Sequence, residues 1–246
     1  MDPGDVDRRD VENAAEAVRE IFPETPLQLN DHLSRRYSAN VWLKREDLTP
    51  VRSYKLRGAF NFMRKAIATG EGGQTFICAS AGNHAQGFAF ACRHFEVPGI
   101  VFMPVTTPQQ KIDKTRMFGG EYITIRLFGD IFDQCYAAAR EHVEVIGGVM
   151  VPPFDDPDII EGQATVAADS LDFDVAIVDV NLAGQASYPV AEILTRRSIP
   201  FVFVSGYGSS GLRPEWQHVA SVSKPVDTRQ LGEAIARAMA DPAPKP

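Results

Sequence analysis

The sequence has no excess of positive charge, and this shortage limits the partners that it could have. Its 246 residues include 25 Lys and Arg against 32 Asp and Glu, which gives a formal net charge of −7. Binding to nucleic acid through its phosphates needs a basic surface. The charge balance therefore argues against nucleic acid as the main partner.

Cysteine is scarce, and long apolar runs are missing. Cys78, Cys92 and Cys135 are odd in number and lack metal-binding spacing, so we expect reduced thiols and no metal site. No apolar stretch is long enough to span a bilayer, and the acidic first residues do not read as a signal peptide. We therefore expect a cytoplasmic protein without a membrane partner.

Short apolar runs alternate with segments of helical periodicity along most of the chain. Strands are predicted at residues 41–43, 75–78, 100–103, 122–126, 149–151, 175–180, 201–205 and 221–223. Helices are predicted at residues 11–22, 55–68, 83–95, 108–118, 131–145, 159–169, 188–197, 212–218 and 228–239. This alternation favours parallel sheets that are covered on both faces. The predicted fold class is α/β with doubly wound parallel sheets.

A lysine at the start of a predicted helix is the first candidate for chemistry. Residues 52–58 read Arg-Ser-Tyr-Lys-Leu-Arg-Gly and contain Lys55. A lysine is a good nucleophile toward an aldehyde only when burial or a neighbouring charge lowers its pKa. A lysine considered alone is most often a solvated surface charge, so this segment leaves both interpretations open.

A turn with two glycines leads from a predicted strand into a predicted helix. Residues 80–87 read Ser-Ala-Gly-Asn-His-Ala-Gln-Gly. Free backbone N–H groups at a helix start can hold a carboxylate or a phosphate. We expect Gly82 and Gly87 to let the backbone approach a ligand closely, and Asn83 could donate to a ring oxygen. A plain turn capped by Ser80 is the alternative.

These segments belong to a longer collinear set of motifs. Residues from about 11 to 168 resemble the N-terminal part of fold-type-II pyridoxal-phosphate enzymes, in particular threonine dehydratase, with serine racemase as a relative. The motifs that carry the resemblance are Thr25-Pro26-Leu27, Leu43–Asp47, Arg52–Gly58, Ser80–Gly87, Phe118-Gly119-Gly120, Pro153-Phe154-Asp155 and Glu161-Gly162-Gln163.

The resemblance implies a cofactor, a substrate and roles for residues. Lys55 would be the Schiff-base lysine of pyridoxal 5′-phosphate. The loop that binds the substrate carboxylate would consist of Ser80, Ala81, Gly82, Asn83 and His84, with Asn83 also facing the 3′ oxygen of the cofactor. The implied reaction is β-elimination of water from threonine or serine, which are small-molecule amino acids.

The match to this family weakens after residue 168. The family holds the cofactor phosphate with a tetraglycine loop, whereas residues 181–185 read Asn-Leu-Ala-Gly-Gln here. The serine that contacts the pyridine nitrogen has no match. One glycine in five makes a poorer phosphate cradle than four, so we favour cofactor binding with impaired turnover over full catalysis.

The last part of the chain carries a second set of motifs. Asp179, Ser205 and Lys224 each end a predicted strand, so the three side chains would meet at one sheet edge. Residues from about 171 to 240 resemble the second half of a response-regulator receiver domain, which has a flavodoxin-like fold. The resemblance implies that Asp179 is the phosphoacceptor, Ser205 the switch hydroxyl and Lys224 the partner of the phosphate. Such a site needs Mg²⁺ and an acidic pair, and the pair is absent.

Two truncated motif sets that meet without a linker suggest a recombined or engineered chimera. We expect residues 1–51 to pack on the second lobe, 52–168 to form a lobe with a four-stranded parallel sheet, 169–240 to form a receiver-like half-domain, and 241–246 to be a disordered tail. One merged sheet is the alternative. Three functions stay open: a pyridoxal-phosphate ammonia-lyase, a phosphoacceptor module and a scaffold without activity. Each is compatible with an oligomer.

Overall fold

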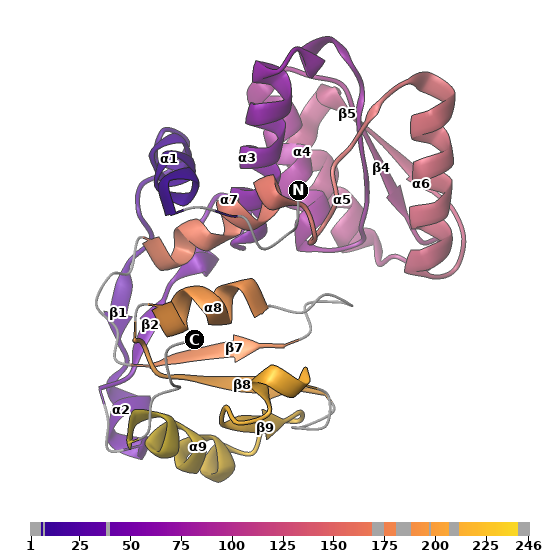
Figure 1. The fold of residues 1–246 in the computed structure, drawn as a ribbon. Helices are drawn as coiled ribbons and strands as arrows, with labels where there is room; N and C mark the ends of the chain where they lie inside the picture. Colours follow the sequence, from indigo (N-terminus) through magenta and orange to yellow (C-terminus); the bar gives the residue numbers. More distant parts are fainter. Residues whose placement is uncertain are drawn as a thin grey trace. The chain divides into compact units, whose positions relative to one another are not determined.

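The computed structural model describes residues 6, 8–37, 40–168, 175–180, 188–196, 198–206 and 212–240. The chain divides into two units, which are Met1–Leu29 with Trp42–Asp169, and Asn30–Val41 with Ser170–Pro246. Figure 1 labels the helices and strands of both units. The expected tail at 241–246 lies outside the described residues.

The first unit contains most of the elements. They are α1 (Arg8–Arg19), β1 (Leu27–Leu29), β2 (Trp42–Lys44), α3 (Lys55–Ala68), β3 (Phe76–Ala79), α4 (Asn83–Phe95), β4 (Gly99–Met103), α5 (Gln109–Gly119), β5 (Ile123–Leu127), α6 (Phe132–Ile146), β6 (Val149–Met150) and α7 (Pro157–Ala168). Short 3-10 helices occupy Glu46–Leu48, Glu71–Gly73 and Gly120–Tyr122. The predicted bounds of α3 and α4 agree with the structure to the residue.

The second unit contains α2 (Asp31–Tyr37), β7 (Ala176–Asp179), α8 (Tyr188–Arg196), β8 (Phe201–Ser205), β9 (Ser221–Ser223) and α9 (Thr228–Ala240). The helix expected at 212–218 is only a 3-10 turn at Pro214–Trp216. The sequence analysis missed α2, because its seven residues have no apolar periodicity. Asn30 was an available signal, since its side-chain oxygen accepts the backbone N–H of Leu33 at 2.9 Å, as at a helix start.

The main sheet of the first unit is parallel throughout, with the strand order β5-β4-β3-β6. Alternate strand residues face opposite layers. Cys78 and Met103 belong to the core that contains residues of α3 and α4, whereas Ile77 and Phe102 pack with residues of α6. Figure 1 shows α6 on one side of this sheet and α3, α4 and α5 on the other. The four-stranded parallel sheet covered on both faces is therefore confirmed.

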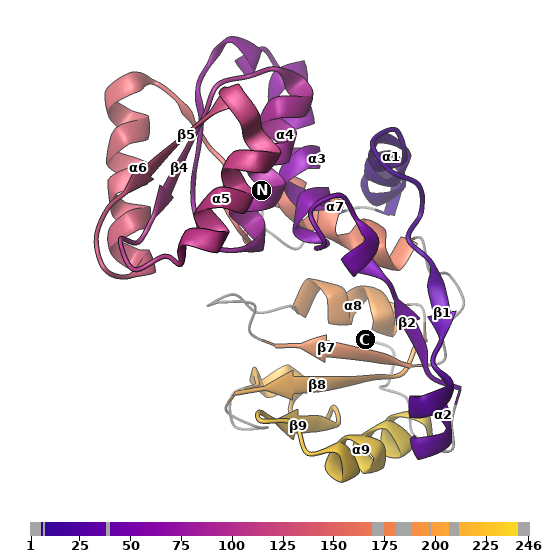
Figure 2. The same cartoon turned by 180° about the vertical axis from the view of Figure 1, so that it is seen from behind.

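The second unit has a three-stranded parallel sheet in the order β7-β8-β9. Phe203 packs on the side of α8, and Val202 packs with Ala234 and Ala238 of α9. The two helices lie on opposite faces in Figure 2. The parallel strands thus form two separate sheets instead of one merged sheet, and β1 and β2 pair antiparallel in a small third sheet. Parallel strands with helices on both faces are common to many α/β folds, so this arrangement does not distinguish a receiver.

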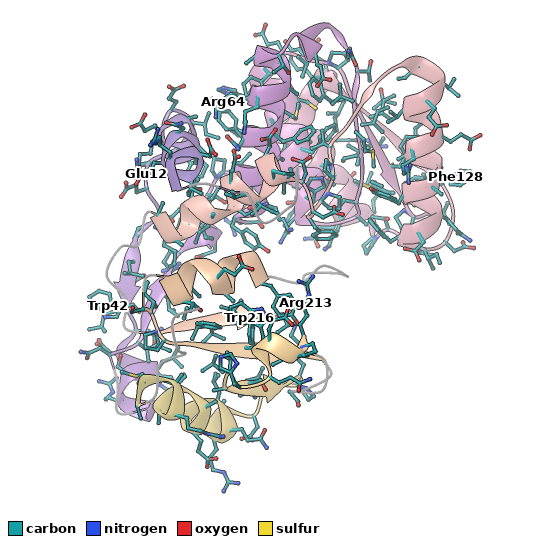
Figure 3. All side chains as sticks on the ribbon, viewed as in Figure 1. Glu12, Trp42, Arg64, Phe128, Arg213 and Trp216 are labelled. Carbon is teal, nitrogen blue, oxygen red and sulfur yellow. The ribbon has the colours of Figure 1, made fainter. Side chains whose placement is uncertain are left out.

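An aromatic cluster covers the α8 face of the smaller sheet. The hydroxyl of Tyr188 accepts the backbone N–H of Arg213 at 2.8 Å, and the guanidinium of Arg213 lies 4.7 Å from the Tyr188 ring centroid. Trp216 stacks on Tyr188 with centroids 6.1 Å apart. Figure 3 labels Arg213 and Trp216 in this unit. The cluster fixes Arg213 and Trp216 against Tyr188 of α8.

The N-terminal segment is divided differently from the expected boundary at residue 51. Only Asn30–Val41 joins the second unit, and the flanking residues join the first. The physical reason is the apolar face of α1, because Val18 and the following Phe22 are buried with Leu56 and Phe60 of α3. Burial of these side chains stabilises the association of α1 with α3.

Two glycines let α3 and α7 cross at close range. A Cβ atom on Gly162 would lie 2.5 Å from the carbonyl oxygen of Arg57 and 2.7 Å from the Cα of Gly58. Neither neighbour can move without displacing the backbone of α3. The Glu161-Gly162-Gln163 motif therefore has a packing role, which keeps α7 against the helix that begins at Lys55.

A buried ion pair ties four separate segments together near the same helices. Arg57 is 1% exposed, and its Nε and Nη2 each donate to a carboxylate oxygen of Glu46 at 2.9 Å. Its Nη1 donates to Thr165 Oγ1 at 2.9 Å, and Thr25 Oγ1 donates to the same Glu46 carboxylate. The bidentate geometry and the hydroxyl partners compensate for the removal of both charges from water.

The structure also bears on membrane and redox chemistry. Within the described ranges, no helix is both long enough and apolar enough to cross a bilayer. Cys78, Cys92 and Cys135 are free and buried. Burial raises the pKa of the Cys78 and Cys92 thiols, so neither is an activated nucleophile.

Replacement of Gly162 tests the helix crossing. We expect Gly162→Ala to lower the free energy of unfolding by about 1–3 kcal/mol, because the added methyl group meets backbone. The matched control is Gly232→Ala in α9, where a Cβ atom meets no other atom within 4 Å. That control should raise stability by up to about 1 kcal/mol, because alanine favours the helix. Urea unfolding followed by circular dichroism measures both, and equal behaviour of the two variants would contradict the packing role.

Replacement of Arg57 tests the buried ion pair. Arg57→Met leaves the Glu46 carboxylate, whose side chain is 13% exposed, without its charged partner. We expect a loss of about 3–5 kcal/mol in unfolding free energy, which Glu46→Gln in the same chain should partly restore. Arg45→Met is the control, because the Arg45–Asp47 pair is exposed and should be worth less than about 1 kcal/mol. An equal cost for both arginines would refute the structural role.

Candidate active site

Lys55 is half-buried at the first residue of α3, in the first unit. Its Nζ donates a hydrogen bond to the carbonyl oxygen of Pro153 at 3.0 Å and lies 4.5 Å from the ring centroid of Phe154. Burial lowers the pKa of this amine to about 8. The structure thus places Lys55 in the environment that a nucleophilic lysine needs, and not on the open surface.

A buried serine fixes the start of α3. Ser53 Oγ accepts the backbone N–H of Lys55 at 3.3 Å. The backbone N–H of Ser53 donates to Thr49 Oγ1 at 2.8 Å, and that hydroxyl donates to the Ser53 carbonyl at 3.0 Å. These bonds hold the turn before α3 at both ends. The first residue of the helix is therefore well positioned before any ligand binds.

The turn from Ser80 to His84 joins β3 to α4, as predicted. Ser80 Oγ accepts the backbone N–H of Gly82 at 3.1 Å, and no side chain caps α4. Ser80 is therefore not the helix cap that the alternative interpretation required. Ala81 and Gly82 are half-buried, and Asn83 is exposed. An uncapped helix start of this kind is suited to binding an anion.

Gly82 and Gly87 have different surroundings. A Cβ atom on Gly82 would meet only Ser80 Oγ, at 4.0 Å, so the space in front of this residue is open. A Cβ atom on Gly87 would lie 2.9 Å from both the Cα and the N of Leu56. The expectation that Gly87 lets the backbone approach a ligand is thus wrong, because its missing side chain lets α4 pack on α3. This packing brings the turn close to Lys55.

His84 points into the protein and not toward solvent. It is 4% exposed, and its Nε2 lies 3.2 Å from the carbonyl oxygen of Val151. Its Nδ1 has no hydrogen-bond partner among the described residues. Burial, together with the charge of Lys55, lowers the pKa of the imidazole to about 4, against the raising effect of the bond to Val151. A neutral, inward side chain leaves only the backbone of His84 for a substrate carboxylate.

The sequence analysis did not foresee the role of the segment after β6. Val151 and Pro153 supply the carbonyl oxygens that His84 and Lys55 contact, and Phe154 supplies the ring beside the amine. The Pro153-Phe154-Asp155 motif was the available signal. A motif of this type shows that the segment matters, but it does not show that the contacts run through backbone carbonyls.

Asp179, Ser205 and Lys224 lie in the second unit. Asp179 is the last residue of β7 and pairs with Val204, while Ser205 is the buried last residue of β8. The backbone N–H of Lys224 donates to the carbonyl oxygen of Ser205 at 2.8 Å. The three residues thus reach the same edge of the smaller sheet. In the part of the chain that the structure describes, no group of three or more metal-ligating side chains is found.

The residues of the first unit fit one half of a pyridoxal-phosphate site. Lys55 offers an amine of lowered pKa, and the open space before Gly82 leads to the uncapped start of α4. His84 Nδ1 adds a buried acceptor without a partner in the described set. Residues 181–187, where a phosphate loop would be expected, lie outside the described residues.

Comparisons with known proteins agree with this geometry. Two biosynthetic L-threonine dehydratases are similar to the chain: that of Bacillus subtilis is 48% identical over 158 residues, and that of Mycobacterium bovis is 44% identical over 199 residues. These matches cover 64% and 77% of the chain but only 37% and 46% of the relatives. The chain thus spans less than half the length of these relatives.

A solved structure extends the comparison to most of the fold. The processed form of threonine deaminase isoform 2 from Solanum lycopersicum superposes with a TM-score of 0.71 at 33% identity, over 94% of the chain and 65% of that structure. The family model described as pyridoxal-phosphate dependent enzyme matches residues 18–242, which include the receiver-like segment. The chain therefore belongs to the pyridoxal-phosphate dependent enzyme family.

Proposed function

We propose that the chain binds pyridoxal phosphate covalently through Lys55 and carries the lysine half of a threonine or serine ammonia-lyase site. The observation that supports this most directly is the half-buried Lys55, with its pKa near 8, at the packed junction of α3 and α4. The relatives named as threonine dehydratases support the choice of substrate class.

Lys55 would both hold the cofactor and move a proton. About a tenth of an amine with this pKa is neutral at pH 7, so a nucleophilic form is present. When bound, the pyridoxal ring supplies a sink for the negative charge that develops at the substrate Cα. Once the amino group of the substrate has replaced Lys55 on the cofactor, the freed amine of Lys55 could take the proton from Cα, because a base near neutral pKa suits that transfer.

The start of α4 would bind the substrate carboxylate. The backbone N–H groups of Asn83 and His84 belong to an uncapped helix terminus, where the partial positive charge of the helix favours an anion. The exposed amide of Asn83 can donate a hydrogen bond to the ring oxygen of the cofactor. Ser80 stays bonded to the backbone of Gly82 and keeps the turn in shape.

We further infer that turnover is impaired. Asn181–Gln185 contains one glycine, which offers fewer close backbone N–H contacts to a phosphate than a glycine-rich loop does. A cofactor without a firm phosphate anchor is not held in one reactive geometry, and positioning accounts for a large part of catalysis. We therefore expect covalent attachment to be easier to detect than ammonia release.

Cofactor titration of the full chain tests the attachment. We expect a visible absorbance band with pyridoxal phosphate, and borohydride reduction should fix the cofactor on Lys55 in a mass-spectrometric digest. Attachment should become faster as the pH rises toward about 8, because the neutral amine is the nucleophile. Lys55→Ala should abolish the adduct, and Lys114→Ala, at an exposed position of α5, should not. Attachment at other lysines alone would reject the proposal.

A second candidate function rests on the smaller sheet. Asp179, Ser205 and Lys224 reach neighbouring strand ends, as a phosphoacceptor site would require. In this alternative the chain is a chimera, and Asp179 accepts a phosphoryl group with Mg²⁺. The acidic pair that would hold the metal is missing from the sequence. The candidate therefore ranks below the cofactor-binding function.

Binding of a phosphoryl analogue tests this second candidate. Beryllofluoride with Mg²⁺ should perturb the fluorescence of Trp216, which lies in the same unit, and Asp179→Asn should abolish the change. Asp227→Asn, just before α9, is the control and should retain it. No Mg²⁺-dependent change in the unaltered chain would reject the phosphoacceptor function. Failure of both this test and the cofactor titration would leave a scaffold without activity.

A further inference from the structure

The segment that follows β6 has almost no backbone donors. The backbone N–H of Val151 donates to the carbonyl oxygen of Ile77 at 2.8 Å and ends the ladder. Pro152 and Pro153 follow, and proline has no N–H group. Beyond the ladder, Pro152 and Pro153 can make backbone hydrogen bonds only through their carbonyl oxygens, which need donors from other parts of the chain.

Two side chains from different helices supply those donors. The carbonyl of Val151 lies 3.2 Å from Nε2 of His84, at the start of α4, and the carbonyl of Pro153 accepts Nζ of Lys55, at the start of α3, at 3.0 Å. The close packing at Gly87 brings the two helix starts together. The backbone from Val151 to Pro153 thus links His84, at the start of α4, to the amine of Lys55, at the start of α3.

The bond to Val151 defines the tautomer of His84. A carbonyl oxygen only accepts hydrogen bonds, so Nε2 must carry the proton. Nδ1 is then a bare acceptor, and it has no partner in the described part of the chain. A buried acceptor without a donor is destabilising. An apolar side chain would avoid this cost, so the histidine needs a reason beyond packing.

We propose that His84 is a positioning residue for Lys55, which as the neutral Nε2–H tautomer anchors the Val151–Pro153 segment so that the Pro153 carbonyl holds the lysine amine beside Phe154. The proposal deepens the proposed function, since the position of Lys55 matters if Lys55 is the nucleophile. A neutral imidazole suits this role because it adds no positive charge next to the amine.

Two substitutions of His84 separate the hydrogen bond from the ring. In His84→Gln the side-chain amide nitrogen can take the place of Nε2 and still donate to Val151. In His84→Asn the amide nitrogen matches Nδ1 and is too short to reach that carbonyl. Loss of the anchor should let water reach Lys55 and raise its pKa from about 8 toward the ordinary value of 10.5.

Competitive acetylation of the full chain, without added cofactor, measures this effect. Trace acetic anhydride is applied across a range of pH, and the labelling of each lysine is read by mass spectrometry, with the exposed Lys111 and Lys114 as internal references. We expect the midpoint for Lys55 to rise by about one unit or more in His84→Asn, a roughly ten-fold loss of neutral amine at pH 7. In His84→Gln the midpoint should stay within a few tenths of a unit of that in the unaltered chain.

An unchanged midpoint for Lys55 in folded His84→Asn would overturn the proposal, as would an equal shift in both variants.

A second measurement uses the unaltered chain, so its result does not depend on whether the His84 variants fold. Nitrogen-15 NMR of the imidazole should show the Nε2–H tautomer above pH 5, and protonation only near pH 4. An Nδ1–H tautomer, or titration near 6.5, would also overturn it.

These measurements need no cofactor, so their outcome is separable from that of the proposed function. A chain that fails to bind pyridoxal phosphate can still show the dependence of Lys55 on His84. Conversely, covalent attachment that is the same in His84→Asn and His84→Gln would leave the proposed function intact and remove the positioning role.

Discussion

The ion pair between Arg57 and Glu46 is the interaction on which the first unit most depends. It is almost completely removed from water, and the hydroxyls of Thr25 and Thr165 complete its hydrogen bonds. These residues come from the segment between α1 and β1, the 3-10 helix after β2, α3 and α7. A buried charge is tolerated only when its partners are in place. The pair therefore requires that all four segments be folded together, and Lys55 lies two residues from it.

Close packing of α4 and α7 on α3 then positions the candidate site. Gly162 lets α7 cross α3, and Gly87 lets α4 reach the backbone of Leu56. The two contacts fix α3 from both sides, so its first residue has little freedom. Burial of the amine at this packed junction is the cause of its lowered pKa. The chemistry of Lys55 thus follows from packing more than from neighbouring charges.

The sequence predicted the parts of the fold that have strong periodicity. α3 and α4 were predicted to the residue because their apolar stripes are long and their flanking turns distinct. β1 and α2 were missed because three and seven residues are too few for a period to show. For the site, the motifs located Lys55 and the Ser80–His84 turn. They could not reveal the inward orientation of His84 or the packing role of Gly87, because both depend on which backbone lies opposite.

The placement of Asn30–Val41 in the second unit has a consequence for the order of folding. Residues on either side of this stretch belong to the first unit, whose last helix ends at Ala168. A chain that emerges from the ribosome can complete the first unit before the second is made. The residues of the second unit that follow position 170 are then synthesised only after Asn30–Val41 and the whole of the first unit. Formation of the second unit therefore requires a contact between distant parts of the chain, which is expected to be a slow step.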